Sequence, residues 1–452
     1  DVRRAVAVAL AALIGCAAPE TTRRADIGLL TLPAMNTFAA RTPPGPRLSN
    51  AIIARDFLDL AFRLENGANL LTFSRFEGPI TIAIAGEAPA TLQRDLTRLV
   101  ERLRREARID IREATDGTAS ITVEPVPRRQ ITDVAPTAAC FVRPNVSSWQ
   151  EYRARRRDPT TFWQRLRQRE RMAVFLPSDV SPQEMRDCLH EEVAQALGPV
   201  NDLYRLNQSI FNDNNFHTVL TGYDMLILRA HYDDTLRTGM SPQEVAARLP
   251  GILARINPRG GRRAIAPARP SGADWQSAIN RATNPSVSRT GRINAARRAV
   301  SLAGGFGDVR LAFSHYVIGR LTLASDPQGA LDAFLAAGRL YRSAPDTAIQ
   351  QAHVALQIAA FQLAAGQPEA AIETAEDHVG AARRGEHASL LSLFLLIEAE
   401  ALRDIGDTRT AAVVEAEALA WARYGFGARS EIRARVSEIR ALSPAARGED
   451  AT

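Results

Sequence analysis

The 452-residue sequence contains no lysine, so all 56 of its basic residues are arginine. These arginines give a net charge of +6, and they are spread along the chain rather than gathered in a basic block with interleaved aromatic residues. Proteins that bind nucleic acid usually carry such a block, so the sequence argues against a nucleic-acid partner. Aromatic residues make up only 6% of the chain and alanine is abundant, which favours helices.

Long apolar runs are also missing. The apolar stretch at residues 5–14 follows two arginines and is too short to span a membrane. It runs into Leu-Ile-Gly-Cys at residues 13–16, which resembles the lipobox of bacterial lipoproteins. The resemblance implies that residues 1–16 form a lipoprotein signal peptide and that Cys16 is lipidated, so the protein would be lipid-anchored in the bacterial cell envelope and face the periplasm. An ordinary signal peptide that contains a cysteine is the alternative.

Cysteine is rare: the chain has three, Cys16, Cys140 and Cys188. With the candidate lipidation site set aside, Cys140 and Cys188 remain as a pair. In an oxidising compartment we expect them to form a disulfide. Two buried free thiols are the alternative, because sequence spacing alone cannot decide between them.

The N-terminal half mixes strand and helix patterns. Residues 17–48 are rich in proline, threonine and arginine without a clear period, and we expect a tether there. After it, short β-branched runs predict strands, and apolar residues at helical spacing predict helices. The expected strands are 80–84, 109–111, 121–123, 138–142 and 173–176, with a turn at 116–117, and the expected helices are 51–62, 91–106 and one that begins at 181–182. Together they predict an α+β domain over residues 49–255.

One segment resembles the catalytic motif of a peptidase family. Residues 191–201 read Glu-Glu-Val-Ala-Gln-Ala-Leu-Gly-Pro-Val-Asn. Aligned on Ala-Leu-Gly, this stretch resembles the motif H-E-x-x-H-x-x-G-x-x-H of the metzincin zinc peptidases. The three histidine positions then fall on Glu191, Gln195 and Asn201, and the position of the general-base glutamate falls on Glu192.

Two later segments extend the resemblance. Residues 209–211, Ser-Ile-Phe, take the place of the metzincin Met-turn, with phenylalanine where the methionine would stand, and residues 220–232 resemble the final helix of matrixin-like domains. These landmarks and the order of elements imply a zincin-like fold for residues 49–255. The same region resembles a family of uncharacterised proteins of Gram-negative bacteria that is defined by a domain of unknown function.

The substitutions change the chemistry that the resemblance implies. A metzincin holds zinc with three imidazoles, and one carboxylate takes a proton from the bound water. The substituted donors are a carboxylate and two amides, and hard oxygen donors suit calcium or magnesium better than zinc. We therefore expect Glu191, Gln195 and Asn201 to form a hydrogen-bonded polar remnant without a cofactor, while a bound divalent metal stays open as the alternative. Gly198 would allow the chain to bring either Asn201 or Asp202 back to the site.

The histidines add little to this site. His190 suggests the shorter motif H-E-x-x-H, but Ala194 stands where the second histidine would be. We expect His190 to be a surface or outer-shell residue. Among the others, His217 and His231 are nearest in sequence, and His217 is the one that would approach the site.

The C-terminal third has a repeating pattern. Residues 256–297 are rich in glycine, proline, serine and arginine and predict an interdomain linker, with Trp275 as a docking point. Beyond it, turns near residues 326, 366 and 406 are spaced by about 40 residues, and an alanine-rich helix follows each of them. The pattern resembles tetratricopeptide repeats with long units and predicts a helical-repeat domain over residues 298–445. An ordinary helical bundle is the alternative.

The two domains together predict a function. We expect an envelope lipoprotein whose degenerate metallopeptidase-like domain binds protein or peptide, with the helical repeats as a further protein-interaction surface. On this view the chain is a pseudoenzyme. The alternative is an atypical hydrolase or peptidase that acts on envelope peptides or proteins with Glu192 as general base.

Overall fold

The computed structural model describes residues 32–115, 119–262 and 271–445. These residues belong to two compact units. The α/β unit lies within residues 39–268, and the helical unit combines the described residues 32–38 with those from 271 onwards. The predicted signal peptide, its lipidation site Cys16 and the expected turn at residues 116–117 lie outside the described residues.

A mixed five-stranded sheet forms the centre of the α/β unit. Its strands lie in the order β2-β1-β3-β5-β4, with β4 antiparallel to β5 and the other pairs parallel. Every residue of β5 is buried, as is typical of a parallel strand that is covered on both faces. The strands are β1 (Ile80–Ile84), β2 (Ile111–Glu113), β3 (Ile121–Val126), β4 (Phe141–Pro144) and β5 (Met172–Pro177).

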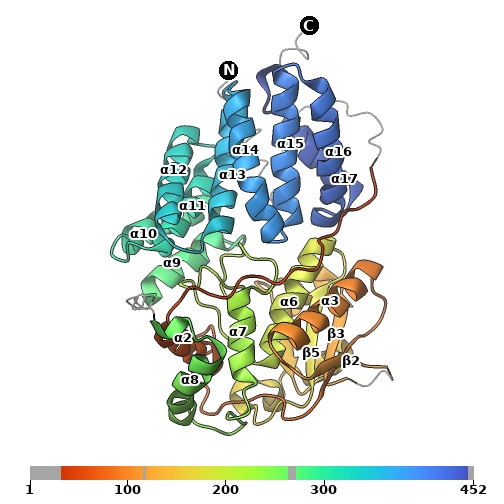
Figure 1. Cartoon of the computed structure of the whole chain (residues 1–452), viewed down its shortest axis with the longest axis vertical. Coiled ribbons are helices and arrows are strands. Elements are labelled where there is room, and N and C mark those ends of the chain that lie inside the picture. Colours follow the sequence, from red (N-terminus) through yellow and green to blue (C-terminus); the bar gives the residue numbers. More distant parts are fainter. Residues whose placement is uncertain (1–31, 116–118, 263–270, 446–452) are drawn as a thin grey trace. The chain divides into compact units, whose positions relative to one another are not determined.

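Different helices cover the two faces of this sheet, because successive side chains of a strand point to opposite faces. Val174 and Leu176 of β5 join the main apolar core, whereas Ala173 and Phe175 join a smaller aromatic core. Figure 1 shows two of the main-core helices, α3 and α6, against the sheet. The main core includes α2 (Asn50–Phe62), α3 (Ala90–Glu106), α6 (Pro182–Leu197), α7 (Gly222–His231) and α8 (Pro242–Ile256), and the smaller core includes α4 (Arg128–Val134) and α5 (Trp149–Arg155). Single 3₁₀ turns complete the unit: η1 (Pro159–Thr161), η2 (Trp163–Arg165) and η3 (Gly260–Arg262).

Helices are the only regular elements in the described part of the helical unit, and consecutive helices pack against one another (Figure 1, cyan to blue). Gly366 and Gly406, which follow the ends of α13 and α15, have positive φ angles of 71° and 88° and so allow the chain to turn. The helices are α9 (Ala273–Thr283), α10 (Arg289–Ala303), α11 (Val309–Thr322), α12 (Pro327–Ser343), α13 (Ala348–Ala364), α14 (Pro368–Arg384), α15 (Ala388–Asp404), α16 (Thr408–Gly425) and α17 (Arg429–Arg440). No helix of the described ranges is long and apolar enough to cross a membrane.

The structure confirms the coarse prediction of a domain of strands and helices followed by an all-helical region, and the first domain is an α/β unit with a mixed sheet. Most expected elements lie within a few residues of their predicted bounds. The expected strand at 138–142 begins only at Phe141, because the preceding residues form a turn in which the Ala138 amide donates to the Ala135 carbonyl at 3.1 Å.

The predicted linker at residues 256–297 is wrong for most of its length. It contains α9 and the first half of α10, and Trp275 is a core residue that is only 1% exposed. Its indole N–H donates to the Ser314 hydroxyl of α11 at 3.0 Å. Composition misled here because polar residues surround a narrow apolar stripe that includes Trp275 and Ile279.

The predicted tether at residues 17–48 is irregular where it is described, but part of it is bound. In the helical unit, the Asn36 amide donates to the Ala420 carbonyl of α16 at 3.0 Å. Arg423 donates to the Pro33 carbonyl at 2.6 Å, and the Phe38 and Trp421 rings stack with centroids 4.4 Å apart. Residues 32–38 therefore form an extended strap along α16.

Trp275→Ala tests whether α9 belongs to the helical unit. Loss of a buried indole and of its hydrogen bond should lower the free energy of unfolding by about 3–5 kcal/mol. Denaturant unfolding followed by circular dichroism measures this difference. Ser277→Ala, on the exposed side of the same helix, should change it by less than about 0.5 kcal/mol. Equal effects of the two substitutions would restore the linker interpretation.

Candidate functional site

The substituted motif lies on α6, which is fixed at its start and along its length. Ser181 caps the helix by accepting a hydrogen bond from the Glu184 amide at 3.1 Å, and Pro182 occupies the first turn. Further along, a disulfide joins Cys188 to Cys140, immediately before β4, with Cα atoms 5.9 Å apart. The disulfide and the cap give the motif residues a defined position beside the sheet edge.

A buried arginine closes the other end of α6. The Arg169 guanidinium donates to the carbonyls of Gln195 and Ala196 at 2.7 Å and to that of Gly198 at 2.8 Å. It also donates to the Ser74 carbonyl at 3.1 Å. Burial lowers the pKa of Arg169 to about 10, so it stays charged at neutral pH. A cation here satisfies the last carbonyls of the helix and complements the helix dipole.

Gly198 is needed for a steric reason. A Cβ atom at this position would lie 2.7 Å from ring atoms of His231, closer than side chains normally approach. His231 itself packs on Phe73 and has Nε2 at 3.1 Å from the Ser74 carbonyl oxygen. The absence of a side chain at 198 therefore lets α7 approach the end of α6.

Three of the four motif residues converge, and the fourth does not. Glu191, Glu192 and Gln195 lie on α6, and the Gln195 amide approaches an Asp202 carboxylate oxygen at 3.4 Å. Asn201 instead donates its side-chain amide to the Asp59 carbonyl at 3.0 Å. Of the two candidates for the third position, it is thus Asp202 that joins the α6 residues.

The structure adds two acids from distant loops, Glu65 and Asp213. We call Glu65, Glu191, Glu192, Asp202 and Asp213 the carboxyl cluster. Burial and the charges of Asp213 and Glu65 raise the pKa of Glu191 to about 8. Burial and Glu65 raise the pKa of Asp213 to about 6.

The two most buried members of the cluster hold its least satisfied atoms. Burial, followed by the charge of Glu191, raises the pKa values of Glu192 and Asp202 well above their ordinary values. Glu192 accepts a hydrogen bond from the Val142 amide of β4, yet its Oε2 atom has no partner in the described structure. The same is true of Asp202 Oδ1. Burial therefore disfavours the ionised form of both groups.

These residues do not fit the zinc site that the resemblance implies. The Asn201 side chain is directed to Asp59, and Gln195 is directed to Asp202, so the substituted positions do not present three donors to one point. Within the described ranges, no group of three or more His, Cys, Asp or Glu side chains is arranged to hold a metal ion. We derive no catalytic step through zinc.

The segment in place of the Met-turn has a structural role. Phe211 is fully buried, and its carbonyl accepts a hydrogen bond from the Leu203 amide at 3.0 Å. Asp224 at the start of α7 accepts hydrogen bonds from the Ser209 hydroxyl and the Ile210 amide. Asp224 also forms a capping box with Thr221, so this turn and α7 are held together by one carboxylate.

The neighbouring histidines lie outside the carboxyl cluster. His190 is buried, contrary to the surface position among those expected, and its Nδ1 accepts a hydrogen bond from the Leu220 amide at 3.1 Å. Burial, with Arg102 and Arg186 nearby, lowers its pKa well below the usual range, so the ring is neutral. His217 Nε2 lies 2.9 Å from the Asn207 carbonyl oxygen, so its nearest partner is this backbone group.

Sequence reasoning missed Glu65, Tyr204 and Asp213. Tyr204 forms a hydrogen bond with Asp213 and, like it, comes from the loop between α6 and α7. The one local signal was the density of polar residues after Gly198, where Asn201, Asp202 and Asp213 occur in a loop with little apolar periodicity. Nothing in the sequence near Glu65 indicated its position.

Comparison with known proteins gives one match. A family model described as a protein of unknown function (DUF2927) matches residues 50–251, so a domain of this family covers the α/β unit from α2 into α8. No curated protein and no solved structure matches the chain. The family description names no activity, and the function has to be inferred from the geometry.

Glu191→Gln should stabilise the protein at alkaline pH. Between the ordinary glutamate pKa of 4.5 and the folded value of about 8, the folded state binds more protons than the unfolded state, so stability falls as the pH rises through this range. The glutamine variant should exceed the parent by at least about 1 kcal/mol at pH 8 and match it at pH 4.5. Denaturant unfolding at both pH values measures this. Glu170→Gln, an exposed glutamate, serves as the control, and a parent protein that is the more stable at pH 8 contradicts the prediction.

Gly198→Ala should destabilise the α/β unit by about 1–3 kcal/mol, because the new methyl group overlaps the His231 ring. Gly251→Ala in α8 is the matched control, since nothing lies within 4 Å of a Cβ there. That substitution should raise stability by about 0.5–1 kcal/mol through helix propensity. Thermal unfolding of both variants measures the contrast, and opposite signs are expected.

Proposed function

We propose that residues 50–251 form a zincin-like domain that has lost its metal site, in a lipid-anchored envelope protein that binds protein or peptide without hydrolysing it. The order of elements supports the zincin-like part. A strand, a long helix and further strands precede α6 with the substituted motif, and the turn at 209–211 and α7 follow it.

The observation that carries the proposal is the environment of Glu192. A general base has to be ionised to accept a proton from water. Glu192 is only 4% exposed, and burial with the charges of Glu191 and Glu65 raises its pKa well above 4.5. Such an environment disfavours the ionised form of the carboxyl group, which is the form that a general base requires, so Glu192 is poorly suited to this role.

The edge of the sheet is also a poor place for a peptide to pair. In the described part of the chain, β4 pairs with β5 alone, which leaves its other side as the sheet edge. Peptides often bind such edges through main-chain hydrogen bonds. Here the outward amide of Val142 is already bonded to Glu192, and Pro144, two residues on, has no N–H. An added strand would find neither donor.

The helical unit offers better surfaces for a polypeptide. A groove of about 440 Å³ lies between α12 and α13, with Leu331, Ile358 and Phe361 among its apolar lining and Gln362 and Gln367 among its polar lining. This combination suits apolar side chains of a partner together with its main-chain amides. The same unit already holds an extended polypeptide, since the strap at residues 32–38 bonds to α16 through main-chain groups.

The proposed location in the cell envelope is supported by the disulfide and not by the lipid anchor. The Cys140–Cys188 disulfide fits an oxidising compartment such as the periplasm. Cys16, the expected lipidation site, lies in the part of the chain that the structure leaves out. We therefore keep the lipid anchor as part of the proposal.

An atypical hydrolase with Glu192 as general base is the competing proposal. It would require a cation beside Glu192 to lower the pKa of its carboxyl group. Glu192 Oε2 and Asp202 Oδ1, both buried without a partner, are the atoms that such a cation would contact. This requirement makes bound metal the property that separates the two proposals.

The test is metal content together with peptidase activity. The chain is dialysed against trace zinc, calcium and manganese and analysed by inductively coupled plasma mass spectrometry. We expect less than about 0.1 metal ion per chain, and we expect the parent and Glu192→Gln to be equally inactive on peptide libraries. One metal ion per chain, lost together with peptide hydrolysis in Glu192→Gln, would overturn the binding proposal.

A binding assay completes the test. A partner recovered from envelope extract should bind Glu192→Gln as well as it binds the parent chain. It should be lost when Leu331 and Leu335, which line the α12–α13 groove, are both replaced by aspartate. Arg339→Gln, on the same helix but outside the groove lining, is the control.

A further inference from the structure

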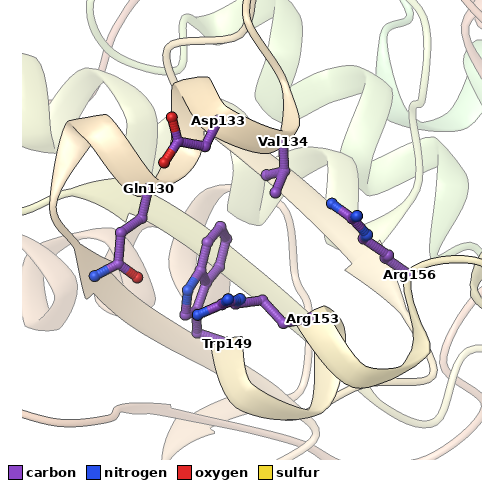
Figure 2. Close-up of a pocket in the computed structure, with 6 residues that line it drawn as sticks. All are labelled: Gln130, Asp133, Val134, Trp149, Arg153 and Arg156. Atoms are coloured by element: carbon purple, nitrogen blue, oxygen red, sulfur yellow. The ribbon is translucent and has the colours of Figure 1, made fainter.

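A second candidate site lies on the face of the sheet opposite α6. A cavity of about 280 Å³ opens between α4 and α5, the two short helices of the smaller core. Figure 2 shows that α4 supplies one side of it and α5 with the residue after it supplies the other. The residues that line it are Gln130, Asp133, Val134, Trp149, Arg153 and Arg156. None of them belongs to the carboxyl cluster.

Trp149 lines the cavity with an unsatisfied donor. The side chain is 7% exposed, and its indole Nε1 has no hydrogen-bond partner in the described structure. Buried indole N–H groups usually find an acceptor, so this one marks a place where an acceptor is missing.

The ring of Trp149 cannot turn away to reach water. Its centroid lies 5.1 Å from that of Phe175 and 5.5 Å from that of Tyr152, and its main-chain amide donates to Glu124 at 2.6 Å. The indole is therefore held in place by packing. Its N–H is a fixed and unpaired donor on a residue that lines the cavity.

Two arginines give the cavity its charge. Arg155, between them in the sequence, is paired with Glu151 and Asp158. Arg153 and Arg156 both line the cavity, and neither forms an ion pair in the parts of the chain that the structure covers. Figure 2 shows that Arg153 comes from α5 and that Arg156 is the residue after this helix, on the same side of the cavity as Trp149. Two unpaired guanidinium groups and one indole N–H are thus donors at the same cavity.

We propose that this cavity binds a small organic oxyanion, a carboxylate or a phosphate ester, with a flat apolar body. The oxyanion accepts hydrogen bonds from Trp149 Nε1 and from the guanidinium groups of Arg153 and Arg156, which suit the planar geometry of such anions. The apolar body lies against the Trp149 ring and Val134. The volume is near the lower end for ligand pockets, which favours a ligand of roughly ten non-hydrogen atoms.

The α4 side sets a limit on the ligand. Asp133 adds a negative charge at the rim, and Gln130 adds an amide beside it. A dianion with charge at both ends would be repelled by Asp133. A ligand with one anionic end and a neutral or donor end avoids that repulsion.

The experiment uses the intact chain with its tryptophan indoles labelled with ¹⁵N. Four tryptophans give four Nε1–H signals, and Trp149→Phe, which keeps an aromatic ring but removes the donor, assigns the signal of Trp149. Benzoate and phenyl phosphate test the two oxyanions, inorganic phosphate tests the charge alone, and benzamide is the neutral equivalent of benzoate. We expect a saturable shift of the Trp149 signal with benzoate or phenyl phosphate and none with benzamide. Whichever of the two binds more tightly identifies the oxyanion.

Variants distinguish a specific binding site from non-specific attraction of anions to arginine. Arg153→Gln with Arg156→Gln should weaken the binding that is measured from the Trp149 signal by at least about tenfold. Arg157→Gln, which removes the same charge from the next residue outside the cavity, should change affinity by less than about twofold.

Three results would overturn the proposal. The first is no saturable shift of the Trp149 signal with either aromatic oxyanion up to about 50 mM. The second is an equal loss of affinity in Arg157→Gln, which would mean unspecific charge attraction. The third is equal binding of inorganic phosphate and phenyl phosphate, which would remove the apolar body from the ligand.

Discussion

The arrangement of the α/β unit depends on one buried cation, Arg169. Its guanidinium donates to three carbonyl groups at the end of α6, which the helix itself leaves without amide partners, and to the Ser74 carbonyl, which His231 also approaches. Those bonds fix where α6 stops and where the loop towards α7 begins. The close approach of His231 to Gly198 follows from that fixed point, as does the return of Asp202 to the helix.

The carboxyl cluster shows the opposite electrostatic situation. Arg169 is a charge with several acceptors, whereas Glu192 and Asp202 are acids without a matching cation in contact. Burial of a charged carboxylate without a partner raises its free energy, so the protonated form is favoured and the pKa rises. Burial thus raises the affinity of these two carboxyl groups for protons.

The sequence predicted elements well where a local signal exists. The helix start at 181–182 and the helical spacing in α3 were placed correctly, because helix-start signals and periodicity act within a few residues. The predicted linker failed at α9, where a narrow apolar stripe was hidden among small polar residues.

The candidate site was only partly predictable, for a different reason. Glu191, Glu192 and Gln195 share one helix, so their proximity follows from spacing. Glu65 and Asp213 reach the same place through tertiary packing, which no local pattern encodes. The cavity beside Trp149 is bounded by α4 and α5, which are too short for a readable period. Its donors became recognisable only when the unpaired indole N–H could be seen.

The edge strand β4 has a consequence for how copies of the protein associate with one another. The unpaired main-chain groups of an open sheet edge can pair with the edge strand of a second copy, and aggregates of many chains can begin in this way. With one outward amide bonded to Glu192 and a proline two residues on, β4 offers a neighbouring chain no donor at either position. Two copies that meet at their β4 edges therefore lack two of the hydrogen bonds that would join their sheets.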